Sequence, residues 1–332
     1  MKNISKIVKA SFGAAAALFI LLAINSSLFA KAKKTDKKSK PSNISIVTTI
    51  FPEYDWVRQL LGENPQKAEL TFLLGNGIDI HSYQPSIQDV AKISTADIFI
   101  FVGGESDGWV KDALKNAKNK DMIVLNLMEI LGDKVKEEEI VEGMECEGED
   151  DHEDAEYDEH VWLSLKNAKV ICEKITEAIC QKDRANANSY QNNLSEYMAQ
   201  LDELDRLYSA VIKEAARDTL IFGDRFPFRY LADDYSLNYY APFLGCSAET
   251  EASFKTVIFL ANKMDELDSK YIFRIESGDE KLAKTIIQNS RKKNGQVLLL
   301  DSMQSVSSKQ AQSTSYLKIM RENLQALQKG LE

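Results

Sequence analysis

The stretch from Asp183 to Ala216 contains neither glycine nor proline, and its apolar side chains recur at intervals of three and four residues. That spacing places them on one face of an α-helix. At 1.5 Å per residue, a helix of about 30 residues is roughly 45 Å long, which exceeds the diameter of a small domain. We therefore expect residues 183–216 to form one connecting helix that runs the length of a two-lobed protein.

Strand and helix patterns alternate on both sides of this helix. Before it, short apolar runs typical of buried strands are separated by amphipathic segments, beginning with ISIVTTIF after Asn43. After it, the alternation resumes with TLIFG at Thr219 and ends with a helical pattern from Ser313 to Leu331. Such alternation predicts parallel sheets covered by helices. The predicted fold is α/β, with two lobes that each contain a mainly parallel four-stranded sheet flanked by helices, joined by one long rigid helix.

The N-terminus has the order of a secretory signal peptide. A basic start precedes an apolar run from Phe12 to Phe29, and the triplet Ala30-Lys31-Ala32 follows. We expect a signal peptide over residues 1–32, a basic linker over 33–43, and a periplasmic or extracellular location. An uncleaved signal that tethers the protein to the membrane is the alternative, because the run is nearly long enough to span a bilayer. No cysteine follows the run, so we expect no lipid anchor there.

The remaining chain divides into an N-terminal α/β lobe over 44–182, the connecting helix over 183–216 and a C-terminal α/β lobe over 217–332. With 332 residues and 44% hydrophobic side chains, the chain is long enough for two buried cores. Its net charge is −10 although the first 43 residues are strongly basic. An acidic body repels phosphate backbones and attracts cations, so we expect no nucleic-acid partner.

Two of the three histidines lie where α/β proteins place ligand sites. His81 follows a predicted strand in GNGIDIHSYQPS, and His160 ends the run DAEYDEH just before the apolar residues VWL. Neutral imidazole is the commonest transition-metal ligand, and an apolar surround increases its selectivity. Each histidine alone is more often a surface residue than a ligand.

Acidic side chains offer further ligands. Glu276 follows the strand pattern YIFRI and Asp301 follows QVLLL, although many such residues only cap turns or helices. The segment 137–159 contains fourteen Asp or Glu side chains, no Lys or Arg, and the residues Cys146 and His152. It cannot form a core, so we expect a flexible acidic loop. The loop is either a solubilising insertion or a weak collector of metal ions beside a tighter site.

Taken together, GIDIHSYQPS, DEHVWLS, the long helix and VLLLDS resemble the metal-binding subunits of ABC importers for zinc and manganese. The resemblance implies a site between two lobes. His81 and His160 would come from the first lobe, and Asp301 and Glu276 from the second. The third ligand of that family, a His or Glu five residues before a Tyr, falls on Arg225. Arginine cannot ligate a metal, because it stays protonated.

This departure leaves the coordination set open. Glu276 or Asp224 takes the vacant place, a water fills it, or Arg225 neutralises an extra carboxylate. Cys246 is a further candidate, and His152 an auxiliary one. We rank Glu276 above Asp224 and Cys246.

The resemblance also implies a function. It predicts an extracytoplasmic solute-binding protein that captures a divalent metal in the cleft between the lobes and delivers it to an ABC transporter permease. Two imidazoles and two carboxylates suit Zn²⁺ or, with added oxygen ligands, Mn²⁺, and the usual order of affinities favours Zn²⁺. A manganese- or iron-specific binding protein of the same fold and a surface adhesin are the alternatives. The sequence has no HExxH spacing, nucleophile elbow or glycine-rich phosphate loop, so we expect no enzyme.

Overall fold

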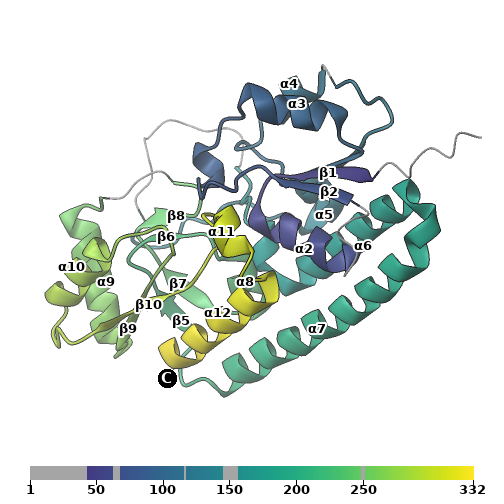
Figure 1. Ribbon diagram of the computed structural model, residues 1–332. Coiled ribbons are helices and arrows are strands. Elements are labelled where there is room, and N and C mark those ends of the chain that lie inside the picture. The colour runs from purple at the N-terminus through teal and green to yellow at the C-terminus, as the bar shows by residue number, and fades with distance from the viewer. Residues whose placement is uncertain (1–42, 63–67, 116, 145–155, 248–250) are drawn as a thin grey trace, which may run out of the picture. The chain divides into compact units, whose positions relative to one another are not determined.

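The computed structural model describes residues 43–332 apart from 63–67, 116, 145–155 and 248–250, and residues 43–332 form one compact unit (Figure 1). The predicted signal peptide and nearly all of the basic linker lie outside the described residues. Within the described part of the chain, no helix has both the length and the apolar character needed to cross a bilayer.

A parallel four-stranded sheet organises the N-terminal half. Its strands are β1 (Ile44–Thr48), β2 (Ala68–Phe72), β3 (Ile98–Phe101) and β4 (Ile123–Asn126), in the order β2-β1-β3-β4. Every pair is parallel. All four side chains of β3 are buried, as expected of an inner strand covered on both faces. This sheet confirms the prediction for the first half of the chain.

Helices cover both faces of that sheet. In Figure 1, α3 and α4 lie on one side of the strands, and α2, α5 and α6 lie on the other. Their bounds are α2 Phe51–Leu61, α3 Ile87–Thr95, α4 Val110–Lys115, α5 Leu127–Leu131 and α6 Leu165–Lys182. Two 3₁₀ turns, η2 (Ile80–Ser82) and η4 (Val161–Leu163), carry or adjoin the two histidines singled out above.

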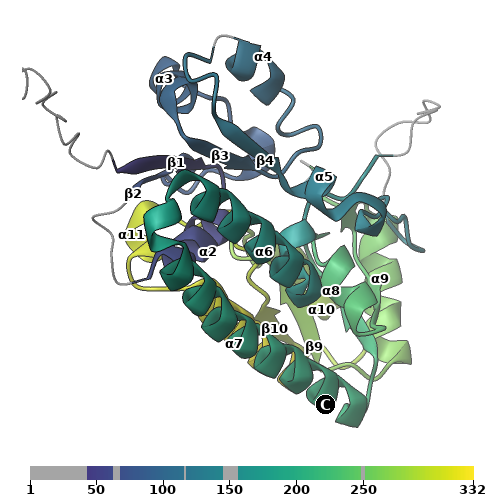
Figure 2. The ribbon, with the colours of Figure 1, turned by 90° about the vertical axis from the view of Figure 1, so that its right-hand side faces the viewer.

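The long helix is present. Helix α7 spans the 28 residues Ala187–Glu214 and follows a short 3₁₀ turn, η5, at Arg184–Asn186. Its buried side chains recur on one face, and the helix packs against α2 and α6 as well as against the C-terminal helix α12 (Tyr316–Gly330). The views in Figures 1 and 2 show it along one side of residues 43–332. The helix predicted over 183–216 is thus confirmed with slightly narrower bounds.

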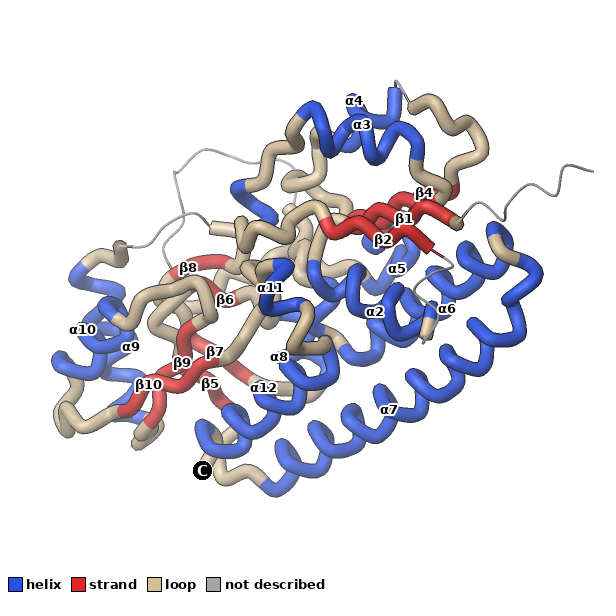
Figure 3. Tube along the Cα trace, viewed as in Figure 1, coloured by secondary structure: helices blue, strands red, loops and turns tan. Residues whose placement is uncertain are grey.

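The C-terminal half differs from the prediction of a single four-stranded sheet. Figure 3 shows short strands there, which form the parallel pairs β5–β7, β9–β10 and β6–β8. Their bounds are β5 Thr219–Ile221, β6 Arg225–Phe226, β7 Asn238–Tyr240, β8 Phe243–Leu244, β9 Tyr271–Arg274 and β10 Gln296–Leu299. A single bridge, Phe222 to Phe273, links the first two pairs. Strand β5 is only three residues long, and all three residues pair with β7.

Helices α8 (Arg229–Asp234), α9 (Phe254–Glu266), α10 (Lys281–Asn289) and α11 (Ser308–Ala311) complete the C-terminal half. Helices α9 and α10 enclose a small hydrophobic cluster with β5 and β9, and a larger cluster extends from the first sheet through α7 to α12. The last residues return to the N-terminal half.

Helix α2 is held by the end of the chain. Arg58 donates hydrogen bonds from Nη1 to the carbonyl oxygen of Ala311 (2.7 Å) and from Nη2 to that of Thr314 (2.8 Å). The backbone amide of Tyr316 donates to Oδ2 of Asp55 at 2.7 Å. Asp55 is fully buried, so these contacts fix α2 and the start of α12 as one packed block.

The acidic segment 137–159 is ordered at both ends. Glu137 and Tyr157 form an antiparallel bridge, and the amide of Asp158 donates to the carbonyl of Lys136 at 2.9 Å. The middle of the segment, including Cys146 and His152, lies outside the described residues. The three described cysteines, Cys172, Cys180 and Cys246, are free thiols, as expected for the first two.

Candidate metal centre

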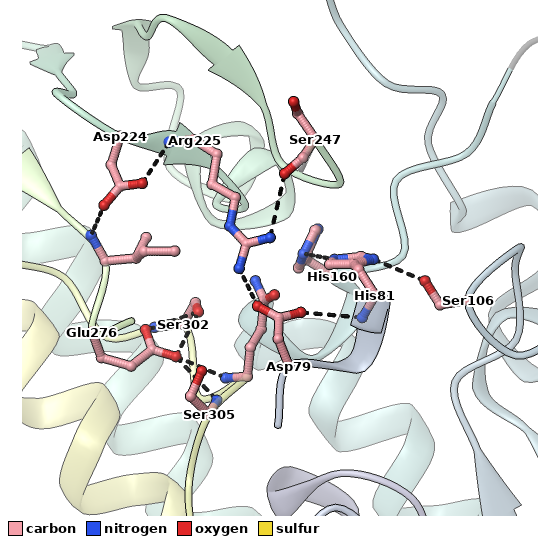
Figure 4. Close-up of polar contacts among 12 residues, drawn as sticks. Asp79, His81, Ser106, His160, Asp224, Arg225, Ser247, Glu276, Ser302 and Ser305 are labelled. Carbon is pink, nitrogen blue, oxygen red and sulfur yellow. Dashed lines mark hydrogen bonds and ion pairs between the residues drawn. The ribbon is translucent and has the colours of Figure 1, made fainter. Parts of the chain in front are cut away.

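His81 is fixed by the turn that carries it. Asp79 caps η2 by accepting a hydrogen bond from the backbone amide of His81 at 3.1 Å. The ring nitrogen Nδ1 lies 2.8 Å from Oγ of Ser106, so the other nitrogen, Nε2, faces away from that contact. Nε2 of His81 lies 3.2 Å from Nε2 of His160 (Figure 4).

His160 is completely buried. Oδ1 of Asp158 accepts hydrogen bonds from the backbone amide of His160 (2.8 Å) and lies 3.0 Å from its ring Nδ1. The ring packs against Trp162, whose indole nitrogen donates to the carbonyl of Ser302 at 2.8 Å. Residues 161–163 are all buried and form the apolar surround that the sequence predicts.

Cys246 joins the two histidines. Among the described residues, His81, His160 and Cys246 form the group of potential metal ligands whose ligating atoms all lie within 4.8 Å of one another. Cys246 follows β8, and the preceding Gly245 lies directly beside the ring of His160. A Cβ atom at Gly245 would be 3.0 Å from Cε1 of that ring, so glycine allows this close approach. The sequence ranking placed Cys246 below Glu276, whereas the structure brings Cys246 to the imidazoles.

The carboxylates proposed from sequence lie outside that group in the described chain. Glu276 accepts hydrogen bonds from the backbone amides of Ser302 (2.8 Å), Gln304 (3.0 Å) and Ser305 (3.2 Å), so it organises the loop after β10. Asp301 accepts one from the amide of Met303 at 2.8 Å. Burial and the nearby Glu276 raise the pKa of Asp301 to about 7.

Asp224 is also bound to its own half. Its carboxylate accepts hydrogen bonds from the amides of Arg225 (2.9 Å) and Ile275 (3.3 Å). His152, the remaining candidate from sequence, lies outside the described residues. The structure therefore unites His81, His160 and Cys246, and it leaves the roles of Glu276, Asp301 and Asp224 as predictions.

Arg225 stands beside the imidazoles as the partner of Asp79. Its Nη2 forms an ion pair with Oδ2 of Asp79, and its Nη1 contacts the carbonyl of Ser247 at 3.4 Å (Figure 4). The pair links β6 of the C-terminal half to the cap of η2 in the N-terminal half. Arg225 thus neutralises a carboxylate, which is one of the roles left open by the sequence, and the carboxylate is Asp79.

Gln304 is a site residue that the sequence did not indicate. With its amide oriented to satisfy its neighbours, its oxygen lies 2.9 Å from Nε2 of His160 and its nitrogen 3.0 Å from Oδ1 of Asp79. A glutamine in an irregular loop has no sequence signal of its own. Only the fold of the loop after β10 brings it to the histidines.

The pKa values of the two imidazoles are shifted in opposite directions. Burial lowers the pKa of His81, and the neighbouring His160 and Arg225 lower it further. Burial alone would lower the pKa of His160 as well, but Asp158 raises it above its ordinary value. Two facing Nε2 atoms can share a contact of 3.2 Å only if one of them carries a proton. A cation between them would replace that proton.

The geometry fits zinc. Two nitrogens at about 2.0–2.1 Å from a tetrahedral Zn²⁺ ion lie about 3.3 Å apart, close to the 3.2 Å observed between the two Nε2 atoms. Two imidazoles and one thiolate form one face of such a tetrahedron. A thiolate suits Zn²⁺ better than it suits Mn²⁺, which prefers oxygen ligands.

Comparison with known proteins adds an independent finding. A family model described as "ZnuA: Zinc-uptake complex component A periplasmic" matches residues 46–330. The high-affinity zinc uptake system protein ZnuA of Bacillus subtilis is 30% identical over 324 residues, which cover 95% of each chain. The zinc-binding protein AdcA of Streptococcus pyogenes is 26% identical over 296 residues, and the match covers 86% of this chain but only 55% of AdcA.

A solved structure has the same fold. The Zn(II)-bound ZnuA-like domain of Streptococcus pneumoniae AdcA superposes with a TM-score of 0.67 at 25% sequence identity. The match covers 87% of this chain and 99% of that domain.

Proposed function

The chain belongs to the family of periplasmic zinc-uptake complex component A proteins, and from this membership we propose that it captures Zn²⁺ outside the cytoplasm and delivers it to the permease of an ABC importer. The observation that supports this proposal most directly is the convergence of His81, His160 and Cys246. The family binds solutes and is not enzymatic.

We infer that His81, His160 and Cys246 provide the first three ligands. Asp301 or Glu276 then supplies a fourth after giving up a backbone amide that it now binds. This set favours Zn²⁺ over Mn²⁺, because soft thiolate ligands select against manganese. A manganese- or iron-specific protein of the same fold is the alternative, and metal competition separates the two.

We further propose that the two halves of the chain act as lobes around the metal. Residues 44–182 and 217–332 act as two lobes around the site, and the connecting helix resists a wide hinge motion because it packs against both halves. Metal binding then changes the contacts across the cleft only locally. Export by a signal peptide over residues 1–32 places the protein in the periplasm or outside the cell.

Native mass spectrometry of the chelator-treated protein tests this function. In an equimolar mixture of Zn²⁺ and Mn²⁺, we expect one Zn²⁺ ion per chain and no stoichiometric Mn²⁺, because zinc ranks above manganese in intrinsic affinity. Elemental analysis of the same sample checks the identity of the ion. Preferential retention of Mn²⁺ would favour the manganese-specific alternative, and the absence of any stoichiometric ion would favour a surface adhesin.

Zinc affinity is expected to decrease as the pH is lowered. Asp158 raises the pKa of His160 in spite of burial, and zinc binds only the neutral imidazole. A raised pKa means that protons already compete with zinc above the ordinary histidine value of about 6.5, and that they compete more strongly below it. Chelator competition from about pH 8 to about pH 5 measures this loss. An affinity that stays constant over that range would contradict imidazole ligation.

A further inference from the structure

Two consecutive carboxylates at the end of the acidic segment each face one of the histidines. Oδ1 of Asp158 lies 3.0 Å from Nδ1 of His160. Oε2 of Glu159 lies 3.5 Å from Nδ1 of His81. In both rings the nitrogen that faces the carboxylate is the one remote from the 3.2 Å contact between the Nε2 atoms. The carboxylates therefore lie behind the imidazoles, and neither of them contacts the Nε2 atoms that face each other.

Glu159 is held in an unusual environment for a carboxylate. It is only 3% exposed, and its Oε1 accepts a hydrogen bond from the backbone amide of Ser106 at 2.8 Å. Its Oε2 is buried and has no hydrogen-bond partner among the described residues. An unsatisfied buried carboxylate oxygen reduces stability. This oxygen is the one that faces Nδ1 of His81.

The backbone is shaped to admit Glu159. Gly104 has a positive φ of 76°, and a Cβ atom there would lie 2.3 Å from Oε1 of Glu159. Glycine at this position thus satisfies both the turn and the close approach of the carboxylate. The turn also carries Ser106, whose Oγ lies 2.8 Å from Nδ1 of His81.

The other end of the acidic segment contacts Cys246. Oε1 of Glu138 accepts a hydrogen bond from the backbone amide of Cys246 at 3.4 Å. The same carboxylate interacts with the thiol, and together with burial it raises the pKa of Cys246. Each of the three candidate ligands therefore has its own carboxylate from the two ends of the acidic segment.

These ends are anchored to the rest of the protein. The hydroxyl of Tyr230 donates to the carbonyl of Asp158 at 2.7 Å and accepts from the amide of Lys136 at 3.0 Å. Arg229 forms an ion pair with Glu139 at 3.2 Å. Both tyrosine and arginine belong to α8, so the C-terminal half fixes the position of the carboxylates.

We propose that Glu159 and Glu138 are positioning residues of the metal centre, in which Glu159 orients His81 and Glu138 orients Cys246. This inference rests on the proposed function. A carboxylate behind a ligating histidine fixes the ring and its tautomer and increases its basicity. The added negative charge also stabilises a divalent ion, and the bound ion in turn stabilises the thiolate of Cys246 against the repulsion of the carboxylate. The acidic segment thus takes part in the site through its ordered ends.

Replacing Glu159 by glutamine tests the inference. Glutamine keeps the shape and the hydrogen bond to Ser106 but removes the charge, so we expect zinc affinity to fall by about 10- to 100-fold. The matched control is Glu156→Gln, because Glu156 is exposed and lies at the same end of the segment. That control removes the same charge without touching a ligand, and its affinity should stay within about twofold of the wild type. Chelator competition measures both.

Two further readouts separate positioning from a structural role. The unfolding temperature of the metal-free Glu159→Gln protein should not decrease, because the variant buries a neutral amide in place of a carboxylate. In the metal-free state, nitrogen NMR shifts of His81 should show the Nδ1–H form in the wild type and a mixture of ring tautomers in the variant. For Glu138→Gln, the thiolate-to-metal absorption of the cobalt-substituted protein should shift.

The outcomes are distinguishable. Tight zinc binding by the wild type that neither Glu159→Gln nor Glu138→Gln weakens would overturn this inference and leave the proposed function standing. An equal loss in Glu156→Gln would also overturn it, because the effect would then be one of total charge. Absence of zinc from the wild type would overturn both proposals.

Discussion

The double variant His81→Ala/His160→Ala is expected to hold no stoichiometric Zn²⁺ under conditions in which the wild type holds one ion. Structural four-ligand zinc sites bind with about 10–16 kcal/mol, which is about 3–4 kcal/mol for each ligand. Loss of two imidazoles therefore corresponds to a decrease in affinity of about 10⁵-fold. Native mass spectrometry after chelation measures occupancy, and circular dichroism checks that the variant is folded.

The third histidine provides the matched control for that experiment. His152 belongs to the acidic segment and lies outside the described residues, and His152→Ala removes one imidazole while it leaves both members of the pair at 3.2 Å in the chain. We expect this variant to retain its zinc ion. Retention of a tightly bound ion by the double variant, or its loss from His152→Ala, would place the principal site elsewhere.

Replacing Cys246 by serine is expected to reduce zinc affinity by about 10²- to 10³-fold, because an alcohol is a poor substitute for a thiolate ligand worth about 3–4 kcal/mol. The preference for Zn²⁺ over Mn²⁺ should decrease as well, since the soft ligand is lost. In the cobalt-substituted protein, the variant should lose the absorption that arises from charge transfer between thiolate and metal. Cys180→Ser is the control, because Cys180 is a half-buried free thiol in α6.

The zinc affinities of such variants also decide between the ligand set that contains Cys246 and the carboxylates proposed from sequence. If Cys246 is a primary ligand, Cys246→Ser costs more affinity than Asp301→Asn or Glu276→Gln. The reverse order would favour the carboxylates proposed from sequence and would show that the loop after β10 rearranges when metal binds. In that case the contacts of Glu276 with the amides of Ser302, Gln304 and Ser305 describe only the empty protein.

The sequence was sufficient to predict the elements whose pattern is local. The stretch without glycine or proline predicts α7 because helical periodicity and helix propensity agree there over many residues. The strands of the first sheet are predicted equally well, since each is a short apolar run between amphipathic segments. In the C-terminal half most of the strands are recognisable from sequence, but a single bridge between Phe222 and Phe273 links the pairs β5–β7 and β9–β10, and no local pattern specifies that link.

The residues of the candidate site also divide into those that the local sequence identifies and those that only the fold brings together. His81 and His160 were identified because the residues next to them are distinctive, and the structure brings them within 3.2 Å of each other. The position of Cys246 depends on the close approach of Gly245 to the ring of His160. The partner of Arg225 proved to be Asp79, far away in the sequence. Contacts of this kind are determined by tertiary packing and leave no trace in spacing or composition.

The contacts between α2 and the end of the chain have a consequence for biosynthesis. Arg58 and Asp55 bind backbone groups of Ala311, Thr314 and Tyr316. The N-terminal half therefore cannot complete its packing until nearly the whole polypeptide has been made. Contacts between such distant residues also slow folding, because a long loop must close first. For a chain whose first residues predict secretion, this delay favours translocation in an unfolded state, with folding completed on the far side of the membrane.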